Sequence, residues 1–249
     1  MKQAVYGIIY LVVLGVIVAG IYFLFLKAPA SCFDGIQNEG EQGVDCGGPC
    51  AQICTSEVQP IMALGAVEVF TPVAGHATAL VQVENANSGF AASSFDYAIT
   101  FYGSDGSNVA VVNGTSFAYA AETKYIIVPN EPVLATSTRA DITVSDVQWV
   151  PSSQLGLLPQ FAFTNVVNVA GTNGYATVNG NITDRDISPF KNIIIIAIFK
   201  SAAGMPVGAS QTELDSLAPN ATQSFSISYP LVPNEDISAT ELHAYAVRN

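Results

Sequence analysis

The chain has 249 residues, half of them hydrophobic, which is enough for one or two packed domains. Its 20 acidic and 8 basic residues give a formal net charge of −12. So acidic a surface repels phosphate backbones, and we therefore expect no nucleic-acid partner, whereas divalent cations and basic partners are compatible with it.

Residues 4–26 form an apolar stretch without a charged side chain, between Lys2 and Lys27. At about 1.5 Å rise per residue, a helix of this length would cross a hydrocarbon core of about 30 Å. We therefore expect residues 1–27 to be a transmembrane signal-anchor that contacts the membrane through residues 4–26. A cleaved signal peptide is the alternative, because Ala28-Pro29-Ala30 looks like its cleavage site, but the apolar stretch is longer than a usual signal core.

All four cysteines of the chain, Cys32, Cys46, Cys50 and Cys54, lie in the next segment, residues 28–56, which we call the neck. Their spacing contains no C-x-x-C pair and no histidine is near, which argues against a zinc site. Behind an apolar N-terminal stretch we expect two disulfides, and the sequence leaves all three pairings open. Because disulfides need an oxidising compartment, we expect a single-pass protein of the cell membrane, with a cytoplasmic N-terminus and extracytoplasmic C-terminal domains.

The neck also carries four residues with side-chain oxygen atoms within a short window: Asp34, Asn38, Glu41 and Asp45. Oxygen ligands of this kind hold calcium, so one interpretation is a calcium site. In the other interpretation, these side chains stabilise turns through hydrogen bonds to the backbone. Both interpretations stay open, and apart from calcium we expect no cofactor.

From Val58 onward, apolar and polar residues alternate, for example over residues 79–84, 95–102 and 138–144. Turn-forming residues separate these runs, at 87–89, 103–106, 112–114 and 129–132. No stretch after residue 55 has a sustained helical period. The sequence therefore predicts an all-β ectodomain built as sandwiches rather than as a parallel sheet.

A weak internal repeat divides this region into two copies. The sequence Val-Pro-Asn-Glu occurs at residues 128–131 and again at 232–235, each time before a closing alternating run. Between the copies, residues 151–159 break the strand pattern with two prolines and a glycine. We therefore expect a first β-sandwich over residues 57–150, a linker over 151–159 and a second β-sandwich over 160–249.

The second copy resembles the FxLYD domains of bacterial and archaeal envelope proteins, which are relatives of the late-embryogenesis-abundant sandwiches. The matching pieces are Gly180 with Ile182, the strand Ile193–Phe199, the turn Leu217-Ala218-Pro219-Asn220, and Phe225-Ser226-Ile227. The chain departs from the pattern at Asp184, where asparagine is usual. The resemblance implies an immunoglobulin-like fold without catalytic residues, so the expected fold class is two immunoglobulin-like β-sandwiches in tandem behind one transmembrane helix and a disulfide-rich neck.

The neck resembles the C-x-D-G-x-x-N-x-x-E-x-G-V-D-C-G-G-x-C segments that recur in secreted and surface proteins as linker modules. The matching residues are Cys32, Asp34, Gly35, Asn38, Glu41, Gly43, Val44, Asp45, Cys46, Gly47, Gly48 and Cys50. This resemblance implies a spacer and gives no activity.

Residue types that carry catalysis are sparse and dispersed in the sequence. The two histidines, His76 and His243, lie near no nucleophile or metal motif, and the chain has no G-x-S-x-G, H-E-x-x-H or phosphate-binding loop. Asp184 and Asp186 flank Arg185 and offer a carboxylate pair, but a charged loop is the better interpretation. We therefore expect that the protein is not an enzyme.

Together these features predict a membrane-anchored, extracytoplasmic binding or scaffold protein of a cell-surface assembly. Its protein partner would contact sheet edges or loops. The alternative hypothesis is a calcium-dependent, adhesin-like protein that binds a ligand or a glycan.

Overall fold

The computed structural model describes residues 2–22, 31–38, 40–50, 52, 54, 58–133, 137–171, 174–232 and 234–248. These residues belong to two compact units, residues 1–57 and 58–249, and each unit is described by itself. The first unit contains helix α1 (Lys2–Ile21) and the neck, where the described residues form turns and one isolated bridge between Gly43 and Cys46.

The expected transmembrane signal-anchor over residues 4–26 is wrong. Helix α1 ends at Ile21, before the expected end of the span at Leu26, and residues 23–26 lie outside the described residues. Where the chain is described, none of its helices combines the length and the apolar character needed to cross a membrane. The single-pass location in the cell membrane, with a cytoplasmic N-terminus and extracytoplasmic C-terminal domains, depended on that span and is corrected with it.

The second unit is all-β, as the alternation predicted. The strands of its first half are β1 (Met62–Ala63), β2 (Glu68–Phe70), β3 (His76–Glu84), β4 (Phe90–Gly103), β5 (Asn108–Ala118), β6 (Thr123–Pro132) and β7 (Ser137–Pro151). A one-turn helix, α2 (Ser152–Leu155), follows. The strands of the second half are β8 (Phe161–Ala170), β9 (Tyr175–Asp184), β10 (Phe190–Lys200), β11 (Pro206–Leu217), β12 (Thr222–Pro230) and β13 (Glu241–Arg248), with a 3-10 turn at Ile237–Ala239.

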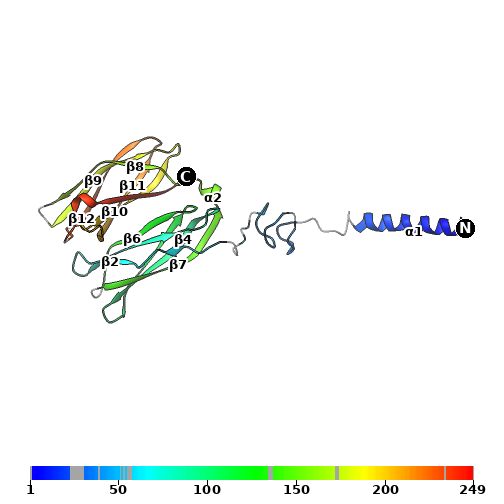
Figure 1. Ribbon diagram of the computed structural model, residues 1–249, viewed down its shortest axis with the longest axis horizontal. Coiled ribbons are helices and arrows are strands. Elements are labelled where there is room, and N and C mark those ends of the chain that lie inside the picture. The colour runs from blue at the N-terminus through cyan, green and yellow to red at the C-terminus, as the bar shows by residue number, and fades with distance from the viewer. Residues whose placement is uncertain are drawn as a thin grey trace. The chain divides into compact units, whose positions relative to one another are not determined.

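These strands form four antiparallel sheets, and the sheet order repeats between the halves. In the first half, β3 pairs with β1, β2 and β6 in sheet I, and sheet II has the order β5-β4-β7. In the second half, sheet III has the order β11-β10-β13 and sheet IV the order β12-β9-β8. Sheet IV thus corresponds to sheet I, and sheet III to sheet II. Figure 1 shows the strands of the first half, cyan to green, beside those of the second half, yellow to red.

Each half has its own apolar core, because alternate residues of its two sheets face each other. In the first half, Phe95, Ile99 and Phe101 of sheet II pack with the buried side chains of β3 and β6. In the second half, Phe190, Ile193, Ile195 and Phe199 of sheet III pack with Ile182, Phe225, Ile227 and Tyr229 of sheet IV. This is the arrangement of two β-sandwiches.

A third apolar cluster joins the two sandwiches, and we call this contact the junction. Leu80 and Ile127 on the outer face of sheet I pack against Ile196, Ile198 and Tyr245 on the outer face of sheet III. Strands β3 and β10 are therefore buried on both faces, which explains the unbroken aliphatic run in β10. The junction makes residues 58–249 one compact unit.

The turns expected at residues 112–114 and 129–132 are wrong, because these residues lie inside β5 and β6. Gly114 is the Cα partner of Tyr97 on β4, and a Cβ atom added to Gly114 would lie 2.3 Å from the Tyr97 hydroxyl. The glycine therefore makes room for a neighbouring ring and does not turn the chain.

Candidate functional site

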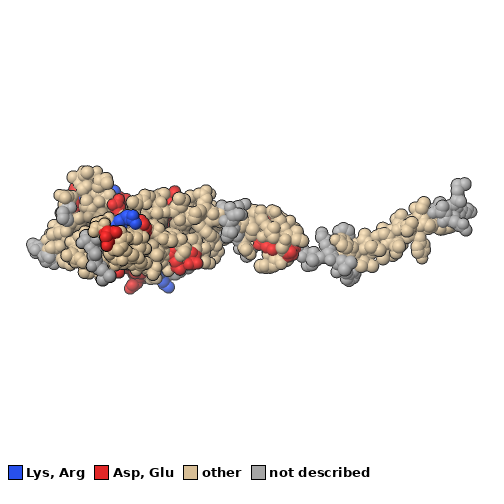
Figure 2. Space-filling model, turned by 90° about the horizontal axis from the view of Figure 1, so that it is seen from below, with Lys and Arg blue, Asp and Glu red and all other residues tan. Residues whose placement is uncertain are grey.

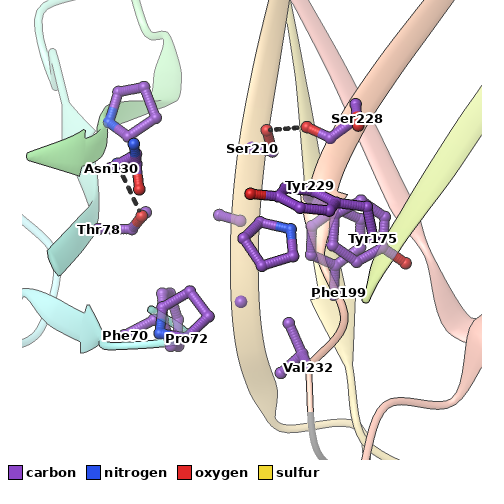
Figure 3. Close-up of a pocket in the computed structure, with 14 residues that line it drawn as sticks. Phe70, Pro72, Thr78, Asn130, Tyr175, Phe199, Ser210, Ser228, Tyr229 and Val232 are labelled. Carbon is purple, nitrogen blue, oxygen red and sulfur yellow. Dashed lines mark hydrogen bonds between the residues drawn. The ribbon is translucent and has the colours of Figure 1, made fainter. Parts of the chain in front are cut away.

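A cleft opens where the junction meets the edge of the second sandwich, and we call it the junction cleft. Its volume is about 180 Å³. From the first sandwich it is lined by Phe70, Pro72, Thr78, Pro129 and Asn130; from the second, by Tyr175, Phe199, Gly208, Ala209, Ser210, Ser228, Tyr229, Pro230 and Val232. Figure 3 shows the labelled side chains on two facing walls, with Phe70 and Asn130 on one and Tyr175 and Tyr229 on the other.

Both copies of the internal repeat contribute to this cleft. Pro129 and Asn130 come from the first Val-Pro-Asn-Glu sequence, and Val232 comes from the second. Asn130 has a positive φ of 52° and Asn234 one of 63°, so the repeated asparagine supplies the left-handed backbone that most other residues disfavour. The backbone N–H of Asn130 donates to the Thr78 hydroxyl at 3.0 Å, which fixes this end of β6 on β3. The repeat thus shapes the wall of the cleft.

Tyr229 is held in place by a ring contact and by partly buried hydrogen bonds. Its ring stacks on Phe199 at a centroid distance of 3.6 Å. Its hydroxyl is within hydrogen-bond distance of Glu235 and, at 3.0 Å, of the Asn168 side-chain oxygen, while the Asn168 amide donates to Glu235 and Thr240. Burial, and then the hydrogen bond to Glu235, raise the pKa of the Tyr229 hydroxyl, so this hydroxyl stays protonated. The Tyr229 ring is therefore held against Phe199, and its hydroxyl carries no charge.

The chemistry of the junction cleft favours a small apolar or ring-shaped group. Its lining is mostly aromatic, proline and aliphatic, and its polar residues are Thr78, Asn130, Ser210 and Ser228. Sites for drug-sized ligands have about 300–1,000 Å³, so a cleft of this size suits one side chain or one ring rather than a whole cofactor.

The neck contains the two expected disulfides. Cys32 is bonded to Cys50 and Cys46 to Cys54, which selects one of the three pairings that the sequence left open. The two bonds interlock, since Cys46 lies within the loop that the first bond closes and Cys54 lies outside it.

Three of the four oxygen-bearing neck residues, Asp34, Glu41 and Asp45, accept hydrogen bonds from the backbone, whereas Asn38 donates through its amide and its buried side-chain oxygen has no hydrogen-bond partner among the described residues. Asp45 accepts from the N–H groups of Asp34 and Gly35 at 2.9–3.0 Å, and Asp34 accepts from the N–H of Ile36 and from the Asn38 amide. The Asn38 amide and Ile36 N–H lower the pKa of Asp34. Glu41 is buried and accepts from the N–H groups of Asn38 and Asp45 at 3.2 and 3.3 Å. These contacts are those of the turn-stabilising interpretation.

A metal-like grouping in the neck has no free thiolate. The side chains of Cys32, Glu41 and Cys50 lie within 4.8 Å of one another. Both sulfur atoms belong to one disulfide, however, and a disulfide sulfur is neither a thiolate ligand nor a hydrogen-bond donor. This grouping is therefore no thiolate metal centre. Figure 2 shows acidic side chains on the neck and at separate places on the β unit, with few basic ones.

The junction also buries a lysine. Lys124 is 3% exposed, and its Nζ donates to the Phe117 carbonyl at 3.0 Å. The ammonium lies 3.6 Å from the Phe117 ring centroid and 4.8 Å from that of Tyr245. Burial lowers the pKa of Lys124 to about 8, although the nearby Glu122 acts in the opposite direction, and burial raises the pKa of Glu122.

The other polar residues singled out in the sequence do not assemble into one site. The ring nitrogen Nε2 of His243 lies within hydrogen-bond distance, 2.7 Å, of the Glu241 carboxylate. His243 belongs to sheet III, whereas His76 belongs to sheet I. Asp184 is fully buried, which raises the pKa of its carboxyl group, and one of its oxygens accepts from the Asp186 N–H. Asp186 pairs with Arg248 rather than with Asp184.

Sequence reasoning missed the junction cleft. Its residues come from seven strands and their ends in both copies, and none of them belongs to a known short motif. The repeated Val-Pro-Asn-Glu sequence was the one available signal, but on its own it indicated only a turn.

Comparisons with known proteins identify no family for this chain. No family model matches it, so the resemblances to FxLYD domains and to cysteine linkers stay predictions. No curated protein matches it either. Among solved structures, the exo-chitosanase CsxA of Amycolatopsis orientalis is 13% identical, with a TM-score of 0.28 over 73% of this chain and 25% of that one. Red sea bream transglutaminase is 11% identical, with a TM-score of 0.21 over 74% of this chain and 31% of that one.

Both of these solved structures are enzymes, so the expectation that the protein is not an enzyme is not kept, and the likeness does not show that this chain is one. The chain spans about a quarter to a third of their lengths. At these TM-scores and identities the likeness is weak fold similarity, and it carries no reaction or substrate over to this chain.

Proposed function

We propose that this chain is a binding or scaffold protein of a larger assembly and that it recognises a partner protein through the junction cleft. The observation that carries the proposal is the cleft itself, with aromatic and proline side chains from two sandwiches on facing walls. Ligand sites occur preferentially at such boundaries between packed modules. The aromatic lining suits a proline or aromatic side chain of the partner.

The junction supports this role by holding the two walls together. Five buried side chains form its apolar cluster, and the Tyr119 hydroxyl donates to the Ala246 carbonyl across it at 3.1 Å. A preorganised cleft loses less conformational freedom on binding than a flexible one. The neck, with its interlocked disulfides, would serve as a spacer.

The test is photo-crosslinking of the full-length protein in its own cells. A photoreactive residue in place of Ser210, in the cleft, should give a defined crosslinked protein, and the additional change Phe70→Ala should reduce its yield at least about tenfold. The matched control replaces Asn113, which is exposed on the outer face of sheet II. Equal products from both positions, or a yield that Phe70→Ala leaves unchanged, would show that the cleft is not the binding site.

A further inference from the structure

The outer face of sheet IV is unlike the rest of this acidic molecule. Strands β8, β9 and β12 contain one ionisable acid, Asp184, and no Lys, Arg, His or Glu. The Asp184 side chain is fully buried, on the opposite side of β9 from this face. In a chain with a net charge of −12, this face therefore carries no charged side chain.

Hydroxyl and amide side chains cover the β9 and β12 part of the face in register, and the exposed Val167 and Val169 of β8 lie on the same face. Asn179 and Asn181 of β9 are the Cα partners of Ser226 and Ser224 of β12. On the other side, Asn181 is the partner of Thr164 on β8. A shallow depression of about 410 Å³ lies over this surface, lined by Asn165, Asn179, Gly180, Asn181, Ser224, Phe225 and Ser226. We call this surface the amide face.

The corresponding face of the first sandwich shows why the amide face does not resemble a protein interface. Sheet I corresponds to sheet IV, and its outer face carries Leu80 and Ile127, which are buried in the junction. The amide face has serine, threonine and asparagine on β9 and β12 instead, and its apolar residues, Val167 and Val169, lie on the β8 strand at its edge. A second copy of the chain would therefore have to bury unpaired polar groups on this face, which is unfavourable.

From these observations we infer that the amide face binds a neutral polysaccharide. Each asparagine side chain offers two N–H donors and an acceptor oxygen, and each serine or threonine hydroxyl can both donate and accept a hydrogen bond. These groups match the hydroxyl groups of a sugar, which also donate and accept. The absence of charge on the face favours an uncharged ligand, because an ionic ligand would find no counter-charge there.

The proposal is separate from the junction cleft, and its test uses different residues. Full-length protein made in a host without N-glycosylation is run in native gels that contain a neutral polysaccharide (mannan, dextran, galactan or β-glucan) or an anionic one (hyaluronan or alginate). At least one neutral polysaccharide should slow its migration, and the anionic ones should not. Asn179→Ala with Asn181→Ala should weaken the retardation at least about tenfold, because two amide contacts are lost.

The matched control is Asn113→Ala, since Asn113 is an exposed asparagine on the outer face of sheet II, and it should leave the retardation unchanged. If the double alanine variant melts early, Asn179→Thr with Asn181→Thr removes the amides and keeps a strand-forming residue. The proposal is overturned if no neutral polysaccharide slows the migration of the wild-type protein. It is also overturned if a neutral polysaccharide slows the double variants as much as it slows wild type.

Two further outcomes assign the face to something else and also overturn the proposal. Asn181-Ile182-Thr183 has the pattern of a glycosylation acceptor, so a glycan attached to Asn181 of the native protein, detected by mass spectrometry, would cover the face. Dimers in sedimentation velocity that the double variant abolishes would assign the face to a second copy of the chain.

Discussion

The backbone N–H of Tyr125 donates to the hydroxyl of Tyr245 across the junction, at 2.9 Å. Tyr245→Phe removes the acceptor and leaves this partly buried N–H without it, so we expect the free energy of unfolding to fall by about 1–3 kcal/mol. Denaturant unfolding measures the difference. Tyr102→Phe, on the outer face of sheet II, is the control and should change stability by less than about 0.5 kcal/mol. Equal losses in both variants would mean that the bond does not stabilise the junction.

The buried Lys124 should make stability depend on pH in the alkaline range. Because burial lowers its pKa in the folded state to about 8, the unfolded chain binds more protons between about pH 8 and the ordinary lysine value near 10.4. The free energy of unfolding should therefore rise with pH in this window, by up to about 1.4 kcal/mol per pH unit from this group. Below pH 8 the cost of burying the charge is fully present.

Lys124→Met tests this linkage, because it keeps the length of the side chain and removes the charge. The difference in unfolding free energy between wild type and Lys124→Met should shift in favour of wild type between pH 8 and 9.5. Lys191→Met, at an exposed position of β10, should show no such shift. A difference that stays constant with pH would place the Lys124 titration outside this window.

The disulfides should stabilise the neck without stabilising the sandwiches. The neck and residues 58–249 belong to separate compact units, and the neck offers few apolar side chains for a core of its own. Changing Cys46 and Cys54 together to serine should therefore speed proteolysis within the neck at least about tenfold, while the sandwiches keep their melting temperature within about 2 °C. If the sandwiches melt early as well, the neck is part of their core.

The hydrogen bonds of Asp45 lead to a prediction about calcium. Because Asp45 accepts from the N–H groups of Asp34 and Gly35, Asp45→Ala should make the neck more sensitive to protease whether or not calcium is present. Millimolar calcium should leave the wild-type neck unchanged, because a site occupied in the folded state would have to protect it. Protection of the wild type by calcium, lost in Asp45→Ala, would establish the calcium site instead.

Local patterns of the sequence determined the secondary structure of the β unit. Strict alternation placed residues 95–102 in β4, and the aliphatic run at 193–199 lies in β10, because side chains alternate between the two faces of a strand. Clustered cysteines were enough to predict disulfides, but their pairing needed the fold of the neck, since spacing alone does not bring two sulfur atoms within bonding distance.

What only the tertiary structure decided is how the faces of the strands are used. Leu80 and Ile196 look like ordinary strand residues in the sequence, yet they meet across the junction, because the outer face of one sandwich packs on the outer face of the other. The junction cleft, with Phe70 and Tyr229 on facing walls, exists only through that contact. The amide face also depends on how the sandwiches pack. The junction buries the outer face of sheet I, whereas the outer face of sheet IV, its counterpart in the second sandwich, stays exposed. Non-local packing of this kind leaves no periodic signal in the chain, so the sequence predicted the strands and not the surfaces that they form.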